Sequence, residues 1–481
     1  MAGELAAEMA TSQEREKAPV LANRQFLVLW LAQLFSQIGQ NAILFTLLII
    51  VLNKTHSTTS TSVLVLSYVV PSVLFGMVAG VLVDRWRKRS VLIATNAVRC
   101  GAALAFLFGS DHVWSLYMIN IGFSTVSQFF TTAEVCTVPF IVPKRQLIAA
   151  NSLVSLAWTM SQFAGMVFVA PIFLKAFGSD VLFVTTALLF ATAAALTRLL
   201  PQIEKGSNRE AAQQEAFLKA APSELAGALR LLRADRASGL AMAQLTLSSS
   251  LVLLFAVLVP RFMQEVLAIR ADDAVYVFFP TGVGALLGLR MLPWLAGKIG
   301  KDRLVALGLI GLAVCLIGLG FVETIADLLK RTESFNPFGR ERLGGLSLLV
   351  ALAMLFAGPL GLTYAMVNAP AQTVLHERAP PEMRGRVFGA QLALASVVAI
   401  VPLLLVGAVV DLYGVSLVLL SIAAVVAIVA AVSVFLTRRG DGLVVEAVSV
   451  ARVDAPHVPL AGDMPAGDGI AGSVDRIQGL D

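Results

Sequence analysis

The sequence predicts an all-α membrane protein with twelve transmembrane helices in two pseudo-symmetric six-helix bundles. The composition, the spacing of the apolar runs and the placement of basic residues predict this class. Of the 481 residues, 57% are hydrophobic and 14% are charged, whereas soluble globular domains carry about 25% charged residues. The net charge is only +5 and is spread over many short loops. It therefore indicates orientation in a membrane and no nucleic-acid partner.

Apolar runs long enough to cross a bilayer recur along the whole chain. A helix needs about 20 apolar residues to span the hydrocarbon core. The runs that meet this length lie near residues 26–52, 63–83, 90–109, 114–138, 152–176, 181–200, 239–262, 274–296, 304–323, 346–368, 388–410 and 415–437. Their even number places both termini on the same side of the membrane.

These spans divide the chain into five parts. The parts are an N-terminal tail (1–24), a first bundle (25–200), a linker (201–238), a second bundle (239–437) and a C-terminal tail (438–481). Pro222, Ser223 and Glu224 resemble a helix start, so we expect an amphipathic helix in the linker. The C-terminal tail is rich in Gly, Ala, Asp and Val, which favours disorder.

Basic residues fix the direction of threading. Of the 36 Lys and Arg residues, 26 lie on the side of the termini and 8 on the other side, and Arg99 and Arg290 lie within spans. Because basic loops stay cytoplasmic, we predict a cytoplasmic (inner) membrane protein with both termini in the cytoplasm. The long outer loop at 324–345 is expected to hold a short surface helix.

The loop between spans 2 and 3 carries the most specific motif. It places Gly80 four residues before the pair Asp84-Arg85, followed by Arg87, Lys88 and Arg89. The last three cations can be explained by topology alone as well as by function. The carboxylate adds nothing to positive-inside orientation, so we expect a functional role for it.

These residues resemble the major facilitator superfamily, whose loop typically reads Gly-x-Leu-Ala-Asp-Arg-x-Gly-Arg-Lys. The matching positions are Gly80, Leu82, Asp84, Arg85, Lys88 and Arg89; the chain departs at Val83 and Arg87. Over residues 24–437, the resemblance implies the major facilitator fold, alternating access and a cytoplasmic latch in this loop. In such a latch Gly80 allows close helix approach, and Asp84 faces the positive amino end of a helix such as span 11.

Two further segments resemble the branch with macrolide-efflux proteins and the enterobactin exporter: Val70-Pro71-Ser72 with Phe75-Gly76, and Arg384-Gly385-Arg386-Val387-Phe388-Gly389. The second half also repeats the basic loops of the first half. Between spans 8 and 9 these residues are Lys298, Lys301, Asp302 and Arg303, and before span 11 they are Arg384 and Arg386. Matching loops in two halves favour a duplicated transporter.

Two charges are predicted to lie inside the membrane. Arg99 lies about 15 Å along span 3, counted at about 1.5 Å per residue, where an arginine costs about 2.5–3.5 kcal/mol. We therefore expect a partner, first Glu134 in span 4 and second Asp84. The pair is interpreted as functional or as a proton carrier, since span 1 lacks an acid; a purely structural bridge is the alternative.

Polar stripes run along four predicted spans. They comprise Gln33, Ser36, Gln37, Gln40 and Asn41 in span 1, Asn120, Ser124 and Gln128 in span 4, Gln244 and Ser248 in span 7, and Tyr364, Asn368 and Gln372 in span 10. Polar faces either line a cavity or bond another helix. In the resembled superfamily these four helices surround the central site, so we interpret the set as cavity lining.

These features predict a secondary active transporter that exports an amphipathic drug, siderophore or lipid-like molecule, driven by protons. An importer with the same fold and a non-transporting scaffold or flippase-like partner of a lipid enzyme are the alternatives. No phosphate-binding loop and no clustered His or Cys residues are present in the sequence, which argues against ATP coupling and against a membrane enzyme. We expect no metal or cofactor, and a monomer in the lipid bilayer.

Overall fold

The computed structural model describes residues 20–202, 236–270, 273–331, 347–378 and 384–453. In these ranges the chain forms helices joined by short connections, and nine helical segments are long and apolar enough to cross a membrane. The prediction of an all-helical membrane protein is therefore confirmed. Most of the predicted linker helix, residues 203–235, lies outside the described residues.

The first half begins with the helices α2 (Arg24–Thr55), α3 (Thr58–Arg85), α4 (Lys88–Gly109) and α5 (Val113–Ile141). They are followed by α6 (Leu147–Phe163), one π-helical segment η3 (Ala164–Val169) and α7 (Ala170–Thr197). The two spans predicted at 152–176 and 181–200 meet at Gly178, where φ is 83°. Glycine adopts this left-handed backbone without a side-chain clash, so the chain bends there.

The second half holds α9 (Arg236–Glu265), α10 (Ala274–Ile299), α11 (Lys301–Gly320), α12 (Val322–Arg331), α13 (Leu348–Arg378), α14 (Arg384–Tyr413) and α15 (Val415–Val453). The short α12 confirms the helix expected next to the long outer loop. Helix α15 continues to Val453, and the disordered tail from residue 438 stays a prediction. Residues 454–481 lie outside the description.

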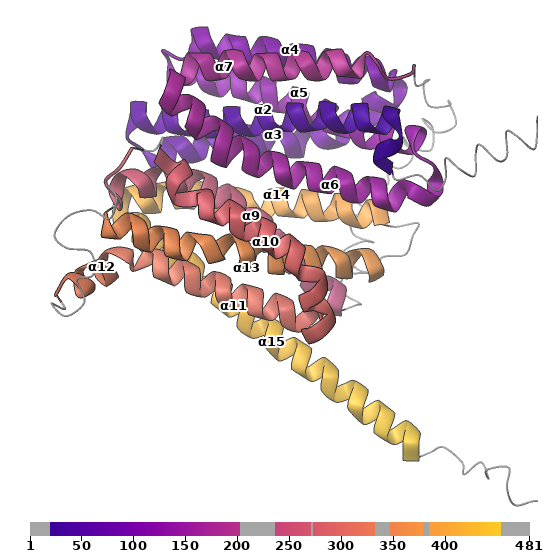
Figure 1. The fold of residues 1–481 in the computed structure, drawn as a ribbon, viewed down its shortest axis with the longest axis vertical. Coiled ribbons are helices and arrows are strands. Elements are labelled where there is room, and N and C mark those ends of the chain that lie inside the picture. Colours follow the sequence, from indigo (N-terminus) through magenta and orange to yellow (C-terminus); the bar gives the residue numbers. More distant parts are fainter. Residues whose placement is uncertain (1–19, 203–235, 271–272, 332–346, 379–383, 454–481) are drawn as a thin grey trace, which may run out of the picture. The chain divides into compact units, whose positions relative to one another are not determined.

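The chain divides into two compact units, Met1–Ser433 and Val434–Asp481. In the first unit α2 and α4 pack on α7, α3 packs on α5, and α10 and α11 pack on α13 (Figure 1). Between the halves, α3 packs along α14. We call the end where α2, α9 and α14 finish the outer end, because the charge pattern predicts that it faces outward.

The buried cores show where the halves meet. The largest core joins both halves and includes Leu47, Leu64, Val257 and Leu403. From α2 it takes only residues in the range 42–51, at the outer end, whereas Phe26 at the other end belongs to a core of the first half alone. Two smaller cores belong to the second half alone. Among the described residues, the halves therefore share an apolar core chiefly at the outer end.

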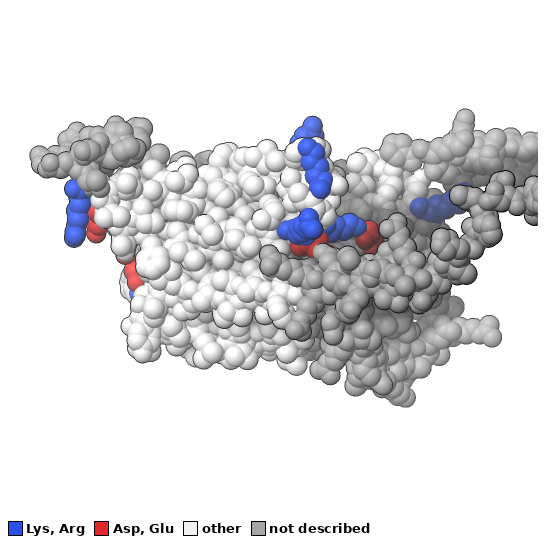
Figure 2. All heavy atoms as spheres, turned by 90° about the horizontal axis from the view of Figure 1, so that it is seen from below, with Lys and Arg blue, Asp and Glu red and all other residues white. Residues whose placement is uncertain are grey.

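The protein surface fits contact with lipid. Large apolar side chains lie exposed on several helices, among them Phe108 and Leu355 with 86% and 63% exposure. On the face drawn in Figure 2, the described acidic and basic side chains lie on either side of a wide uncharged zone. Apolar surface of this kind is stable only when hydrocarbon covers it.

Candidate functional site

A cavity of about 150 Å³ lies between the two halves. The first half lines it from α2, α6 and η3, and the second half lines it from α9, α10, α11 and α13. Aromatic side chains supply much of the wall: Phe45, Phe163, Phe255 and Phe278. The polar side chains in the lining are Gln162, Thr281 and Tyr364. Such a site binds apolar groups and offers few polar contacts.

Close helix packing positions the cavity walls. A methyl group at Gly165 in η3 would lie 2.7 Å from the backbone oxygen of Ile38, so glycine lets η3 approach α2. A methyl group at Gly361 in α13 would lie 1.8 Å from the backbone oxygen of Thr281 in α10. Small residues permit this approach between membrane helices. The π-helical turn η3 itself lines the cavity, as π-turns often do at functional sites.

Of the polar residues predicted to line a cavity, Tyr364 is in the lining. Asn368 follows one turn later on α13 and donates its amide to the Tyr364 hydroxyl at 2.8 Å. Gln372, a further turn along, is exposed. In α2, the amide of Asn41 donates to the backbone oxygen of Gln37 at 2.8 Å, within its own helix.

Other members of the predicted stripes bond neighbouring helices. The donors and acceptors are Gln33 Nε2 with the Val154 oxygen (3.2 Å), Asn120 Nδ2 with Ser67 Oγ (2.8 Å), Ser124 Oγ with the Tyr68 oxygen (2.5 Å) and Gln244 Nε2 with Ser433 Oγ (3.1 Å). Gln128 is half-buried. In this structure, helix–helix bonding accounts for these four residues.

Arg99 is completely buried within the first half. Its guanidinium donates to Gln40 Oε1 at 2.9 Å, to Asn96 Oδ1 at 3.0 Å and to Ser36 Oγ. Gln40 and Ser36 belong to the polar stripe of α2, so that stripe binds an arginine of α4. Neutral oxygens therefore supply the hydrogen bonds of this buried guanidinium.

Glu134 is also completely buried and interacts electrostatically with Arg99. The rings of Phe130 and Phe190 cover the Arg99 guanidinium, with centroids at 4.0 Å and 4.9 Å. In the described part of the chain, both Glu134 carboxylate oxygens lack a hydrogen-bond partner. The indole of Trp158 lies next to the carboxyl, outside hydrogen-bond geometry.

The loop between α3 and α4, predicted to be cytoplasmic, is partly described. Among the described residues, a methyl group at Gly80 would meet no atom within 4 Å; the close helix approach expected there stays a prediction. The Asp84 side chain lies outside the description, while Arg85, which ends α3, and Arg87 are exposed.

Lys88 and Arg89, the next two cations, both contact other residues of the first half. Lys88 is 2% exposed, and its ammonium lies 4.8 Å from the Phe140 ring centroid. The Arg89 guanidinium donates to the backbone oxygen of Arg198 at 2.5 Å. Both side chains therefore contact other residues of the first half at the start of α4.

In the matching loop of the second half, Lys301 forms an ion pair with Glu377 of α13 at 2.6 Å. Lys298 lies 4.1 Å from the Trp294 ring centroid. The side chains of Asp302 and Arg303 are exposed. The side chains of Arg384 and Arg386, in the first turn of α14, lie outside the description.

Polar contacts join the halves at the outer end. Gln264 of α9 donates to Asn53 Oδ1 of α2 at 2.7 Å, and Lys175 of α7 pairs with Asp273 at 2.5 Å. Together with the shared apolar core, these contacts join the two halves at the outer end.

The family model described as Major Facilitator Superfamily matches residues 29–401. The chain belongs to this superfamily. YfiS, an MFS-type transporter of Bacillus subtilis (strain 168), is 23% identical over 406 residues, which is 83% of this chain and 90% of YfiS. The lysophospholipid transporter LplT of Pectobacterium carotovorum subsp. carotovorum (strain PC1) is 24% identical over 156 residues; the match spans 32% of this chain and 37% of LplT.

Solved transporters share the fold at low identity. The nucleoside transporter NupG superimposes with a TM-score of 0.60 at 12% identity, covering 85% of this chain and 98% of NupG. An auto-inhibited POT family peptide transporter gives a TM-score of 0.63 at 13% identity, covering 86% and 97%. The predicted superfamily is confirmed: the chain is a non-enzymatic membrane transporter that acts on a small molecule.

Proposed function

We propose that this superfamily member is a secondary active transporter that exports an amphipathic small molecule by alternating access. The cavity between the halves carries the proposal, because it is apolar and lies between two halves that contact each other at the outer end. We further propose twelve spans in two six-helix bundles, a monomer in the cytoplasmic membrane and both termini in the cytoplasm. With that orientation, the structure represents a state closed to the outside.

The proposed substrate is lipid-like, with one apolar chain and a small polar group. The aromatic wall of the cavity suits a hydrocarbon chain, and Gln162, Thr281 and Tyr364 can bond a polar group without a charged partner. The partial likeness to a lysophospholipid transporter supports this class. Macrolide-like drugs and siderophores, suggested by the exporter-like segments at 70–76 and 384–389, are the other members of the proposed class.

Proton coupling is proposed to act at Glu134. Its carboxyl is buried without a hydrogen bond and lies in the field of the Arg99 guanidinium. Binding or release of one proton changes the charge beside a buried arginine, which shifts the balance between two conformations whenever the site differs between them.

Transport into inverted membrane vesicles tests the proposal. We expect uptake of a fluorescent single-chain amphiphile when the vesicle interior is acidic, and a loss of uptake when the pH gradient is dissipated. Val252→Trp, which fills the cavity from α9, should abolish uptake, whereas Leu355→Trp on the lipid-exposed face of α13 should not. Uptake that is indifferent to both the gradient and Val252→Trp contradicts export through this cavity. Uptake only with the gradient reversed indicates import, and no transport of any amphiphile favours the scaffold.

A further inference from the structure

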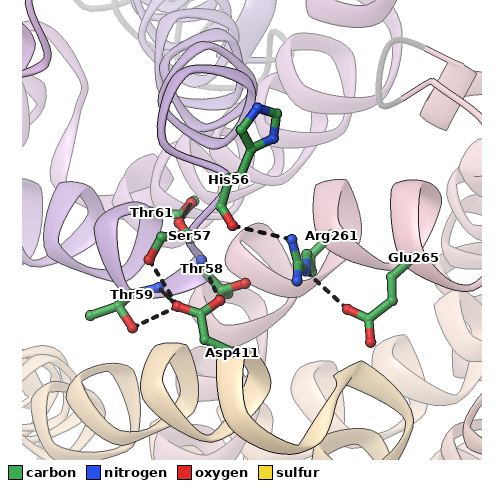
Figure 3. Close-up of polar contacts among 8 residues, drawn as sticks. All are labelled: His56, Ser57, Thr58, Thr59, Thr61, Arg261, Glu265 and Asp411. Atoms are coloured by element: carbon green, nitrogen blue, oxygen red, sulfur yellow. Dashed lines mark hydrogen bonds and ion pairs between the residues drawn. The ribbon is translucent and has the colours of Figure 1, made fainter.

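Asp411 binds the first turn of a helix in the other half of the protein (Figure 3). It lies near the end of α14, and its carboxylate accepts four hydrogen bonds from the start of α3. The donors are Ser57 Oγ (2.8 Å), Thr58 N (2.7 Å), Thr59 N (3.0 Å) and Thr59 Oγ1 (2.8 Å). One side chain of the second half thus binds three consecutive residues of the first half.

The contact has the chemistry of a helix cap. The first backbone N–H groups of a helix have no partner inside the helix, and a carboxylate is stabilised by the positive helix end. Ser57 caps α3 locally by accepting from Ser60 N at 3.3 Å. Asp411 satisfies the earlier N–H groups of Thr58 and Thr59, so α3 has a complete cap only while α14 remains in place.

Gly407, one helical turn before Asp411, allows α14 to approach α3 closely. A methyl group at Gly407 would lie 2.6 Å from Ser62 Oγ and 2.7 Å from Thr59 Cα. Any larger residue would therefore push the two helices apart and draw Asp411 away from α3. The chain turns immediately after Asp411 at Gly414, whose φ of 83° permits the short connection to α15.

A second contact lies beside this cap. Arg261 of α9 pairs with Glu265 of the same helix at 2.9 Å, and its guanidinium reaches the backbone oxygen of His56 at 3.4 Å. His56 ends α2 in the left-handed region with φ of 50°. The connection between α2 and α3 is therefore held by α9 on one side and by α14 on the other (Figure 3).

We propose that Asp411 is the outer latch of this transporter, a positioning residue whose cap on α3 holds the outer end closed. The inference rests on the proposed alternating access, because opening the outer end must separate α14 from α3 and strip the cap. The resemblance gives Asp84, at the opposite end of α3, a matching role toward the start of α14. The same helix pair then carries one carboxylate latch at each end, and only one is engaged in each state.

Spin-label distances at the outer end test the latch. Labels at Asp111→Cys in the first half and Tyr413→Cys in the second half, in a protein with its three native cysteines replaced, report opening directly. Loss of a helix cap costs about 0.5–2 kcal/mol. We therefore expect Asp411→Ala to raise the ratio of open to closed outer end about 2- to 30-fold. Asp411→Asn, which keeps one acceptor oxygen but loses the charge, should give a smaller rise.

Asp180→Asn is the matched control, because this exposed acid lies at the same end and its described hydrogen bond is with the neighbouring Ser179. We expect its distance distribution to match that of the parent. Unchanged distances in both Asp411 variants, or equal opening in Asp180→Asn, overturn the latch. If Asp411→Ala fails to fold, the distances in Asp411→Asn test the latch. The spin-label distances can be measured whether or not the protein transports an amphiphile. Absence of transport by the unsubstituted protein would therefore contradict the proposed function, and the distances would still test the latch.

Discussion

Replacing Arg99 by methionine should destabilise the first half strongly. The substitution removes three hydrogen bonds: it leaves the Gln40 and Ser36 oxygens without the guanidinium donor and the Asn96 oxygen with the Ser36 hydroxyl as its remaining donor. Breaking a buried charged network by removing one partner costs about 3–5 kcal/mol. Methionine keeps apolar contact with Phe130 and Phe190, so lost packing adds little. We therefore expect a loss of about 3–5 kcal/mol, with the network as the main cause.

The unfolding temperature of the purified protein in detergent measures this loss. Arg290→Met is the matched control, because Arg290 is an exposed arginine of α10, and surface changes cost at most about 0.5 kcal/mol. In Arg99→Met the Glu134 carboxyl loses its nearby positive charge, so adding Glu134→Gln should recover part of the loss, by about 1 kcal/mol or more. Equal unfolding temperatures for Arg99→Met and Arg290→Met would refute the reasoning. If the stability lost in the double variant Arg99→Met/Glu134→Gln equals the sum of the two single losses, Arg99 and Glu134 are not coupled.

Three further outcomes are expected. Glu134→Gln cannot exchange a proton, so uptake into inverted vesicles should no longer respond to the pH gradient; a retained response excludes Glu134 as the coupling site. Gly361→Ala should lower the unfolding temperature sharply because its methyl would lie 1.8 Å from the Thr281 oxygen, whereas Gly101→Ala meets no atom within 4 Å and should be neutral; similar temperatures contradict the close packing of α10 and α13. Val252→Trp should weaken the thermal stabilisation of the protein by single-chain amphiphiles, measured by ligand titration, and an unchanged titration places the binding site elsewhere.

The positions of the helices could be predicted because lipid imposes a length on each apolar run. The run at 26–52 became α2, Arg24–Thr55, and the break between 176 and 181 became the bend at Gly178. The last run, 415–437, became the apolar part of α15, Val415–Leu436.

The cavity lining could not be predicted from the sequence. Phe255 lines the cavity while Leu355 is exposed to lipid, yet both lie in apolar runs of similar composition. Their surroundings differ because of how each helix is rotated about its own axis, which the composition of an apolar run does not specify. The polar stripes were visible, but their partners depend on packing: Asn120 bonds Ser67 of α3, and Gln40 bonds Arg99 of α4.

The outer latch was missed for a different reason. Asp411 is a single acid near the end of an apolar run, with no motif around it. Its significance depends on α3, whose first turn lies more than 350 residues earlier in the chain. The resemblance directed attention to the other end of the same helix, where the Asp84 side chain lies outside the described residues.

Transfer of a fluorescent lysophospholipid across proteoliposome membranes tests the central claim most directly. The claim is that an amphipathic molecule crosses through the apolar cavity between the halves. It predicts faster transfer in vesicles with the parent protein than in protein-free vesicles, and a return to the protein-free rate with Val252→Trp but not with Leu355→Trp. Equal rates with the parent and with Val252→Trp would contradict it.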